Sequence, residues 1–319
     1  MSEPCIGVVI VHHRNPQLTS ECLDHLLQST GVLLQIRLID NSDKGDAPFP
    51  NLPPGGPTFS HAFKMLRTSN QGFSHANNQG LRDFQAGLSD KDIPRPDAVL
   101  LLNNDAFVRP DTLALLFKDV SVGPSTAALS GATLLNRDGS IQSRGFRWFL
   151  HRGTGKALHD TPQAMHERDR SRLNPYIDYP TGAALMLNLV ALEALNWRMD
   201  EDYFLYFEEL DLLSRLQSNR TLQASPHITV ASKATCVHLE GATAQSGHRH
   251  HDRSAWSEFH FHRSKRLFYT KHFPALHYWI GLLHTGVLLK RLTMGDFRRF
   301  WGGVTGFWGA RVWSAERED

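Results

Sequence analysis

Short apolar runs that end in polar residues recur along the first third of the chain. Residues 6–11 stop at a His pair, residues 35–39 at Asp40 and residues 98–102 at Asn103. Runs of this length, separated by segments of helical periodicity, predict buried strands alternating with helices. The carboxyl ends of parallel strands share one edge of an open sheet, and ligands bind there. We therefore expect a site at this edge. The elements expected in this half are strands at 6–11, 35–39, 63–66 and 98–102, a loop at 48–57, and helices at 18–27 and from residue 81.

The apolar pattern becomes less regular beyond residue 126. A basic stretch at 144–179 has weak periodicity, and we interpret it as a long loop that closes over a ligand. The other expected elements are strands at 127–135, 181–189, 228–231 and 235–237, a tight turn at 137–140, and helices at 190–195, 210–216 and 257–268.

Composition narrows the class of protein. The 319 residues are 41% hydrophobic and 21% charged, which is typical of a large globular domain. A net charge of +2 is too small to indicate nucleic acid as a partner. The three cysteines form no CxxC pair, and no signal peptide or membrane-spanning run is evident. We expect a cytoplasmic protein.

The strand end Asn103-Asn104-Asp105 carries two amides and a carboxylate. A hard cation such as Mg²⁺ or Mn²⁺ takes oxygen ligands, and one or two carboxylates plus substrate phosphates hold it. The alternative is an Asx-rich turn before the helix that follows Pro110. The motif alone favours the turn.

A second polar cluster, Glu208, Glu209 and Asp211, begins a predicted helix. Carboxylates are favoured at helix N-termini, which accounts for one of the three. The aromatic residues at 203–207 would raise a carboxyl pKa towards the range of a general base. One of the glutamates is therefore a candidate catalytic base.

Together these segments form an ordered series over the first three quarters of the chain. The series resembles the family 2 inverting glycosyltransferases of the GT-A fold, and particularly their bacterial rhamnosyltransferase-like branch. The resemblance implies an α/β fold with a mixed, Rossmann-like sheet, helices on both faces and a C-terminal helical extension. The matching segments are 8–11, Asn15, 22–23, 38–42, 70–73, 77–80, 101–105, 181–183 and 200–212.

The resemblance also implies roles for individual residues. Asp40 matches the acid that contacts the nucleobase and ribose of the donor. Asp105 matches the last acid of the family's DxD-type metal motif, in which Asn103 here replaces the first acid. Glu209, and after it Glu208, matches the base. The remaining donor-binding candidates are His13, Asn15, Asn70, Gly72, Asn77, Asn78, Asn103 and Asn104, and the floor of the sugar and acceptor site is Thr181-Gly182-Ala183.

His238 resembles a histidine that the family gives to its metal, and imidazole suits Mn²⁺ better than Mg²⁺. The alternative is an ordinary surface histidine, in a chain that has 18. We predict a site for Mg²⁺ or Mn²⁺ at Asp105 and His238.

The C-terminal region alternates basic residues with Trp, Phe and Leu over residues 273–313. This pattern is typical of a helix at a membrane surface, and equally of a stripe that packs on the catalytic domain or on a second subunit in a homo-oligomer. We divide the chain into a catalytic domain at 1–245, with a nucleotide-binding half to about residue 125 and an acceptor half at 126–245, and an extension at 246–319.

The predicted function is transfer of a sugar, with rhamnose as the family-level expectation, from a nucleotide-diphosphate donor to a hydroxyl of a glycan or lipid-linked acceptor in surface polysaccharide synthesis. Two alternatives stay open: a nucleotidyltransferase, and a catalytically silent scaffold that binds nucleotides or glycans. The enzyme would lie in the cytoplasm or peripherally on the inner face of the cell membrane.

Overall fold

A mixed β-sheet forms the centre of the computed structural model, which describes residues 3–43, 63–88, 95–121, 127–159, 176–219, 227–239 and 254–309. Its strand order is β3-β2-β1-β4-β11-β6-β12-β5, with β7 paired to β6. The strands are β1 (Cys5–His12), β2 (Leu33–Asp40), β3 (Phe63–Arg67), β4 (Ala98–Asn103), β5 (Ala106–Val108), β6 (Ala127–Leu135), β7 (Ile141–Ser143), β11 (Ala184–Asn188) and β12 (His227–His238).

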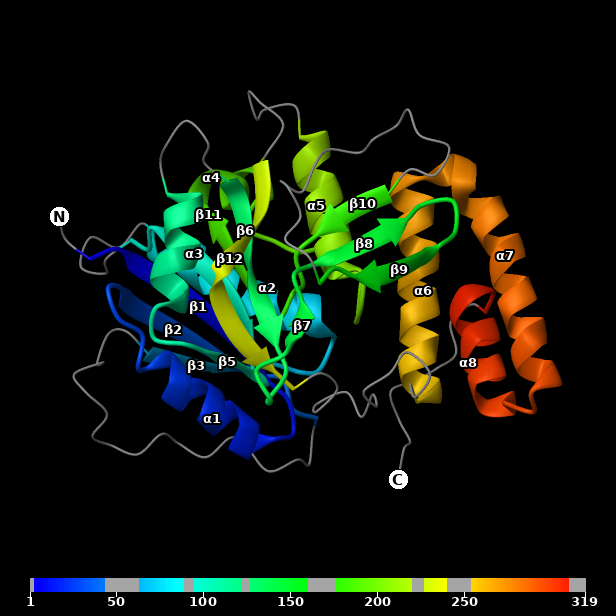
Figure 1. Cartoon of the computed structure of the whole chain (residues 1–319), viewed down its shortest axis with the longest axis horizontal. Helices are drawn as coiled ribbons and strands as arrows, with labels where there is room; N and C mark the ends of the chain where they lie inside the picture. The colour runs from blue at the N-terminus through cyan, green and yellow to red at the C-terminus, as the bar shows by residue number, and fades with distance from the viewer. Residues whose placement is uncertain are drawn as a thin grey trace.

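The first four strands are parallel, as the sequence predicts, and β11 reverses direction between β4 and β6. Helices cover both faces (Figure 1). Alternate residues of β1 enter different clusters: Val9 packs with α2 (Phe73–Gly87), and Ile10 packs with α1 (Pro16–Leu26). A strand buried on both faces reads as a continuous apolar run, which explains why the sequence showed it clearly. The other helices of this part are α3 (Thr112–Val120), α4 (Leu189–Ala194) and α5 (Glu208–Ser218).

Two of the expected elements in the large sheet and its helices need correction. Helix α2 begins at Phe73, eight residues before the expected start, because its first turns are rich in polar amides that resemble a loop. Strand β12 is continuous, with a register irregularity between Ala231 and Thr235, where two strands were expected. The expected loop at 48–57 lies outside the described residues.

The stretch at 144–179 is not a loop in its described parts; residues 160–175 of it lie outside them. It forms a second sheet of β10 (Tyr176–Tyr179), β8 (Phe146–Phe149) and β9 (Thr154–Ala157). These strands are too short for alternation to be recognised. Packing holds the sheet in place: the Trp148 indole N–H donates to the Tyr269 hydroxyl at 3.0 Å, and its ring meets Phe207 edge-on.

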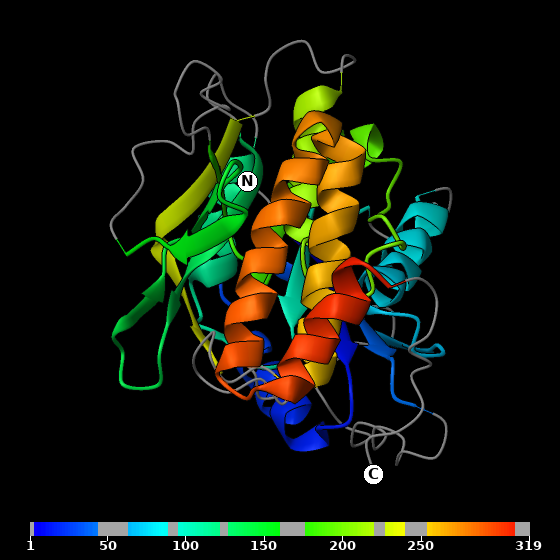
Figure 2. The ribbon, with the colours of Figure 1, turned by 90° about the vertical axis from the view of Figure 1, so that its right-hand side faces the viewer.

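Three C-terminal helices complete the molecule at one side: α6 (Ala255–His272), α7 (Pro274–Thr293) and α8 (Phe297–Phe307) (Figures 1 and 2). Their buried residues Phe268, Ile280 and Phe307 belong to the same hydrophobic cluster as Val9 of β1. The predicted boundary at residue 245 remains a prediction, but the core is continuous across it. None of the helices in the described ranges is long and apolar enough to cross a bilayer.

Candidate active site

Strand register brings three predicted site segments together at one edge of the sheet. His12 at the end of β1 lies opposite Asp40 of β2, and Asn103 of β4 lies opposite Val11. Asp40 is buried, and its carboxylate accepts the Ser42 backbone N–H at 3.1 Å. The expected edge of the sheet therefore exists, and its polar groups come from strands far apart in the sequence.

Asn70 links the loops at this edge. Its side-chain oxygen accepts hydrogen bonds from the Asn41 amide at 3.2 Å and from the Gly72 N–H at 3.3 Å, and its own amide donates to Asp43 at 3.2 Å. His13 contacts the Asn41 carbonyl through Nδ1 at 3.1 Å. These contacts fix the positions of the loops that the resemblance assigns to the nucleotide.

Gly72 is the point where this segment meets the acidic segment. Its φ of +108° is a conformation that side chains disfavour, and a Cβ here would lie 2.6 Å from the Phe204 carbonyl oxygen. The Phe73 N–H donates to that same oxygen at 2.8 Å. Only glycine permits this approach.

Four amides predicted to bind the donor are engaged inside the protein. Asn15 caps α1 by accepting the Leu18 N–H, and Asn104 donates to the buried Thr19 hydroxyl at 2.9 Å. The Asn77 amide donates to the carbonyl of Phe73 one turn earlier. The Asn78 amide donates to the Met199 carbonyl, and the Asn78 side-chain oxygen accepts the Met199 N–H. We leave these four out of the donor site proposed below.

Asp105 and His238 lie side by side, although they are far apart in the sequence. Antiparallel pairing of β12 with β5 places His238 opposite Ala106, and its Nε2 lies 3.4 Å from Asp105 Oδ1. Gln142 contacts His238 Nδ1 through its side-chain oxygen at 3.0 Å, which orients the ring with Nε2 towards Asp105. A carboxylate next to an imidazole nitrogen is the arrangement that the predicted Mg²⁺ or Mn²⁺ site requires.

The donor set at this point fits a divalent cation. Asp105 and His238 supply a carboxylate and an imidazole, and two residues before Asp105 the buried side-chain oxygen of Asn103 accepts no hydrogen bond in the structure. The spacing of Asp105 and His238 is close to that of two ligands on one ion. In the described ranges, no group of three or more His, Cys, Asp or Glu side chains is arranged so that it could hold a metal ion. Substrate phosphates would have to supply further ligands.

The segment 181–183 connects this strand end to the acidic cluster. The Asn103 N–H donates to the Ala183 carbonyl at 2.9 Å, and the Gly182 N–H donates to Glu209 Oε1 at 3.0 Å. A Cβ on Gly182 would lie only 2.4 Å from that carboxylate oxygen. The Glu209 carboxylate is thus fixed next to the end of β4 by a glycine that cannot be enlarged.

Glu208 and Glu209 occupy the first turn of α5, and both carboxyl groups are perturbed by burial. Burial raises the pKa of Glu209, and burial together with the Glu209 charge raises the pKa of Glu208 well above its usual value. One Glu208 oxygen is buried without a hydrogen bond. Tyr206 and Phe207, just before the helix, both have left-handed φ angles of 71° and 72°. Such strain is unfavourable and often lies at functional sites.

Asp211 has a structural role, as one of the sequence interpretations suggested. It accepts hydrogen bonds from Arg215 at 2.7 Å and contacts His272 at 2.8 Å. Burial alone would raise its pKa, but these partners outweigh burial and lower the pKa. It therefore stays ionised and paired.

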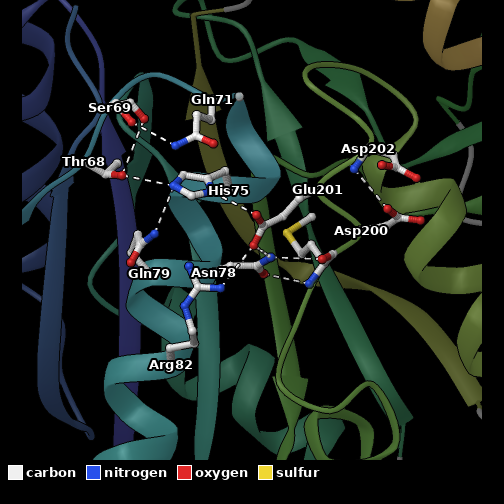
Figure 3. A network of polar contacts seen from close by, with 12 residues as sticks. Thr68, Ser69, Gln71, His75, Asn78, Gln79, Arg82, Asp200, Glu201 and Asp202 are labelled. Carbon is white, nitrogen blue, oxygen red and sulfur yellow. Dashed lines mark hydrogen bonds and ion pairs between the residues drawn. The ribbon is translucent and has the colours of Figure 1, made fainter. Parts of the chain in front are cut away.

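A polar network attaches the acidic segment to α2 (Figure 3). Glu201 accepts hydrogen bonds from the Asn78 amide at 2.8 Å and from Arg82 at 3.1 Å, and it lies 2.9 Å from His75 Nδ1. Lys271 of α6 pairs with Asp202 on the other side. The segment leading to Glu208 is therefore held between two helices.

Sequence reasoning missed two supporting residues, Gln142 and Glu201. Gln142 carries no signal, because its position beside His238 depends on the pairing of β7 with β6. Glu201 lies within the resembling series, but nothing in the sequence assigns it His75 and Asn78 as partners.

No known family profile matches the chain, and a comparison with curated proteins finds no match. Among solved structures, the mannosyltransferase PcManGT from Pyrobaculum calidifontis, solved with GDP-Man and Mn²⁺, has a TM-score of 0.52 at 14% identity, covering 97% of this chain and 89% of that chain. S. aureus TarS has a TM-score of 0.46 at 12% identity over 84% of this chain, and GalNAc-T7 has 0.47 at 17% over 74%. The matches span only 40% of the TarS chain and 44% of the GalNAc-T7 chain.

The likeness to PcManGT establishes the fold. The chain is a mixed α/β protein with the GT-A fold of glycosyltransferases, as the sequence predicted.

Proposed function

We propose that the protein is an inverting glycosyltransferase that uses a nucleotide-diphosphate sugar. One observation carries the proposal: the Asn103-to-Ala183 and Gly182-to-Glu209 hydrogen bonds connect the half-buried Glu209 carboxylate to the end of β4, two residues before Asp105. A base next to a diphosphate and metal site is the arrangement that direct glycosyl transfer needs. The GT-A fold and the resemblance of the motifs also support a glycosyltransferase.

The proposed donor site is the edge formed by the ends of β1, β2 and β4. Asp40 would contact the nucleoside, with the loop walls held by His13, Asn70 and Gly72. Asp105 and His238 would hold Mg²⁺ or Mn²⁺, and the ion would stabilise the charge on the leaving diphosphate. The carboxylate–imidazole pair favours Mn²⁺ of the two.

Glu209 would act as the general base. Its carboxylate removes the proton from an acceptor hydroxyl, whose oxygen attacks the anomeric carbon from the side opposite the diphosphate. The new C–O bond forms as the bond to the diphosphate breaks, so the configuration inverts and a nucleoside diphosphate leaves. A raised pKa suits this role because it increases the basicity of the carboxylate.

We further propose rhamnose as the first donor sugar to test and a glycan or lipid-linked hydroxyl as the acceptor, in surface polysaccharide synthesis. The resemblance supports these choices. A few contacts in the pocket decide between sugars.

Two variants separate the proposed roles. Asp105→Ala and Glu209→Gln should each abolish transfer, but only Asp105→Ala should weaken Mn²⁺-dependent nucleotide binding in calorimetry. Full activity of Glu209→Gln would exclude it as the base.

A thermal-shift comparison of UDP, dTDP and GDP, each with and without Mn²⁺, tests the class of protein. Stabilisation by one nucleotide that requires the metal is expected of the transferase. Stabilisation by glycans alone would instead indicate a binding scaffold.

A further inference from the structure

The outward face of α7 is apolar. Tyr278 is 84% exposed and Leu282 is 65% exposed, and they lie on the same side of the helix as Trp279 and Leu289. Helix α7 contains no Asp or Glu. A helix at the surface of a globular protein usually turns polar side chains to water.

The inward face of α7 carries polar side chains beside the buried Ile280 and Leu288. His284 is buried and lies 3.1 Å from the Gly303 carbonyl through Nε2. Arg291 bonds Glu258 of α6, which is also buried, at 2.9 Å. His284 and Arg291 of α7 thus bond inside the protein, while several of its large apolar side chains face outwards.

Helix α8 repeats this arrangement with glycine on its inner side. A Cβ on Gly302 would lie 2.6 Å from the Ala255 carbonyl, and one on Gly306 would lie 2.3 Å from the Phe259 carbonyl. This contact lets α8 lie directly on α6. Phe297 and Trp301 point outwards instead, each 58% exposed, whereas Phe307 is buried.

We define the outer helical face by its exposed residues on α7, α8 and their connection: Tyr278, Trp279, Leu282, Val287, Leu289, Leu292, Met294, Phe297, Trp301 and Trp308. These helices lie next to one another at one side of the molecule (Figure 2). Many exposed apolar side chains on two neighbouring helices indicate an interaction site.

Charge and residue type indicate what covers this face. Residues 274–309, which form α7, α8 and their connection, contain four Lys or Arg and a single acid, Asp296, which lies 3.6 Å from Arg299. Lys290 and Arg298 are exposed beside the apolar residues. Trp and Tyr prefer the boundary between lipid and water, and basic residues bind anionic headgroups.

We propose that the outer helical face docks on an anionic lipid bilayer, with α7 and α8 lying in the plane of the interface. Trp279, Leu282 and Trp301 would enter the acyl region, and Lys290 and Arg298 would contact headgroups. The proposal concerns surface docking, and it stands whether or not the proposed transferase activity is confirmed. Residues 310–313 of the stretch expected from the sequence lie outside the described residues.

Vesicle flotation of the full-length protein tests the proposal. We expect binding to phosphatidylcholine vesicles that contain phosphatidylglycerol, and weaker binding to phosphatidylcholine alone. Leu282→Glu should reduce binding about tenfold or more, and Lys290→Glu with Arg298→Glu should reduce binding to the anionic vesicles by several-fold.

Val190→Glu is the matched control, because Val190 is 63% exposed but lies on α4, away from the outer helical face. It should bind like the wild type. Circular dichroism and thermal melting of each variant verify that it is folded. The proposal is overturned if the wild type does not float, or if Leu282→Glu and Val190→Glu bind equally. It is also overturned if the wild type forms a dimer that does not bind vesicles and Leu282→Glu makes this dimer dissociate. The face would then bind a second copy of the chain.

Discussion

Glu201 and Glu208 belong to the same acidic segment but have opposite environments. Glu201 receives hydrogen bonds from Asn78 and Arg82 and contacts His75, and these partners outweigh burial and lower its pKa to about 2. Glu208 is more deeply buried, one of its oxygens has no hydrogen bond, and its pKa is raised well above the usual value.

The comparison shows that hydrogen-bond donors decide the role of a carboxylate more than its position in a motif does. The end of the segment near Glu201 is an anchor, in which every charge is matched. The end at Glu208 and Glu209 is left under-solvated next to a strained turn, and burial raises the pKa of both carboxyl groups. A rigid anchor a few residues away makes such a perturbed site structurally tolerable.

Enlarging Gly182 should have the greatest effect at the perturbed end. Gly182→Ala places a Cβ 2.4 Å from the Glu209 carboxylate and displaces it. We expect kcat to fall about a hundredfold or more, as for loss of a general base, while nucleotide affinity in calorimetry is retained. Gly87→Ala, where the added Cβ meets nothing within 4 Å, is the control. Wild-type kcat in Gly182→Ala would argue against Glu209 as the base.

The raised pKa of Glu209 should appear in the pH dependence of transfer. A base must be ionised, so kcat/KM should fall about tenfold for each pH unit below its pKa. Because burial raises that pKa above 4.5, the acid limb should begin at a higher pH than for an ordinary glutamate. A profile that stays flat down to pH 4.5 would contradict this assignment.

Removing the charge at the anchored end should destabilise the fold. Glu201→Gln weakens charge-assisted hydrogen bonds, and we expect a loss of about 2 kcal/mol in the free energy of unfolding at pH 7. The lowered pKa means that this stabilisation is present above pH 4.5 and is lost as the pH falls towards 2. Denaturation of Glu201→Gln and of the exposed control Glu193→Gln, measured at pH 7 and pH 4, gives both comparisons. An equal, small effect in the two variants would remove the anchor role.

The smallest effect, of opposite sign, is expected for Glu208→Gln. A raised pKa means that ionising Glu208 in the fold is unfavourable, so its contribution is lost as the pH rises from 4.5 through the folded-state pKa. The variant should therefore be about 1 kcal/mol more stable than the wild type at pH 8 and equally stable at pH 4. A destabilised variant at pH 8 would show that the Glu208 charge is compensated after all.

Much of the sheet could be predicted because buried parallel strands are continuous apolar runs that stop at polar residues. Strands β1, β2 and β4 lie within two residues of their expected bounds. The small sheet at β8–β10 could not be predicted, because four-residue strands carry no periodicity and depend on Trp148 packing against Tyr269. The start of helix α2 was predicted too far along the chain, because the amides in its first turns, which form hydrogen bonds inside the protein, resemble a loop in the sequence.

The same division applies to the site. Types and order of residues indicated Asp40, Asp105 and Glu209, but an asparagine that caps a helix and one that faces a nucleotide are identical in a sequence. Asn15 and Asn78 bond within the protein, while Asn70 joins the loops of the candidate site. Only the fold distinguishes them.

The sequence by itself determined strands β1, β2 and β4, that their polar ends share an edge, and that an acidic cluster opens a helix, because these follow from local periodicity and residue type. Tertiary structure alone placed His238 beside Asp105, set Glu209 on the Gly182 N–H and turned the apolar sides of α7 and α8 outwards. Each of these contacts joins residues distant in the chain, and their proximity depends on how whole elements pack.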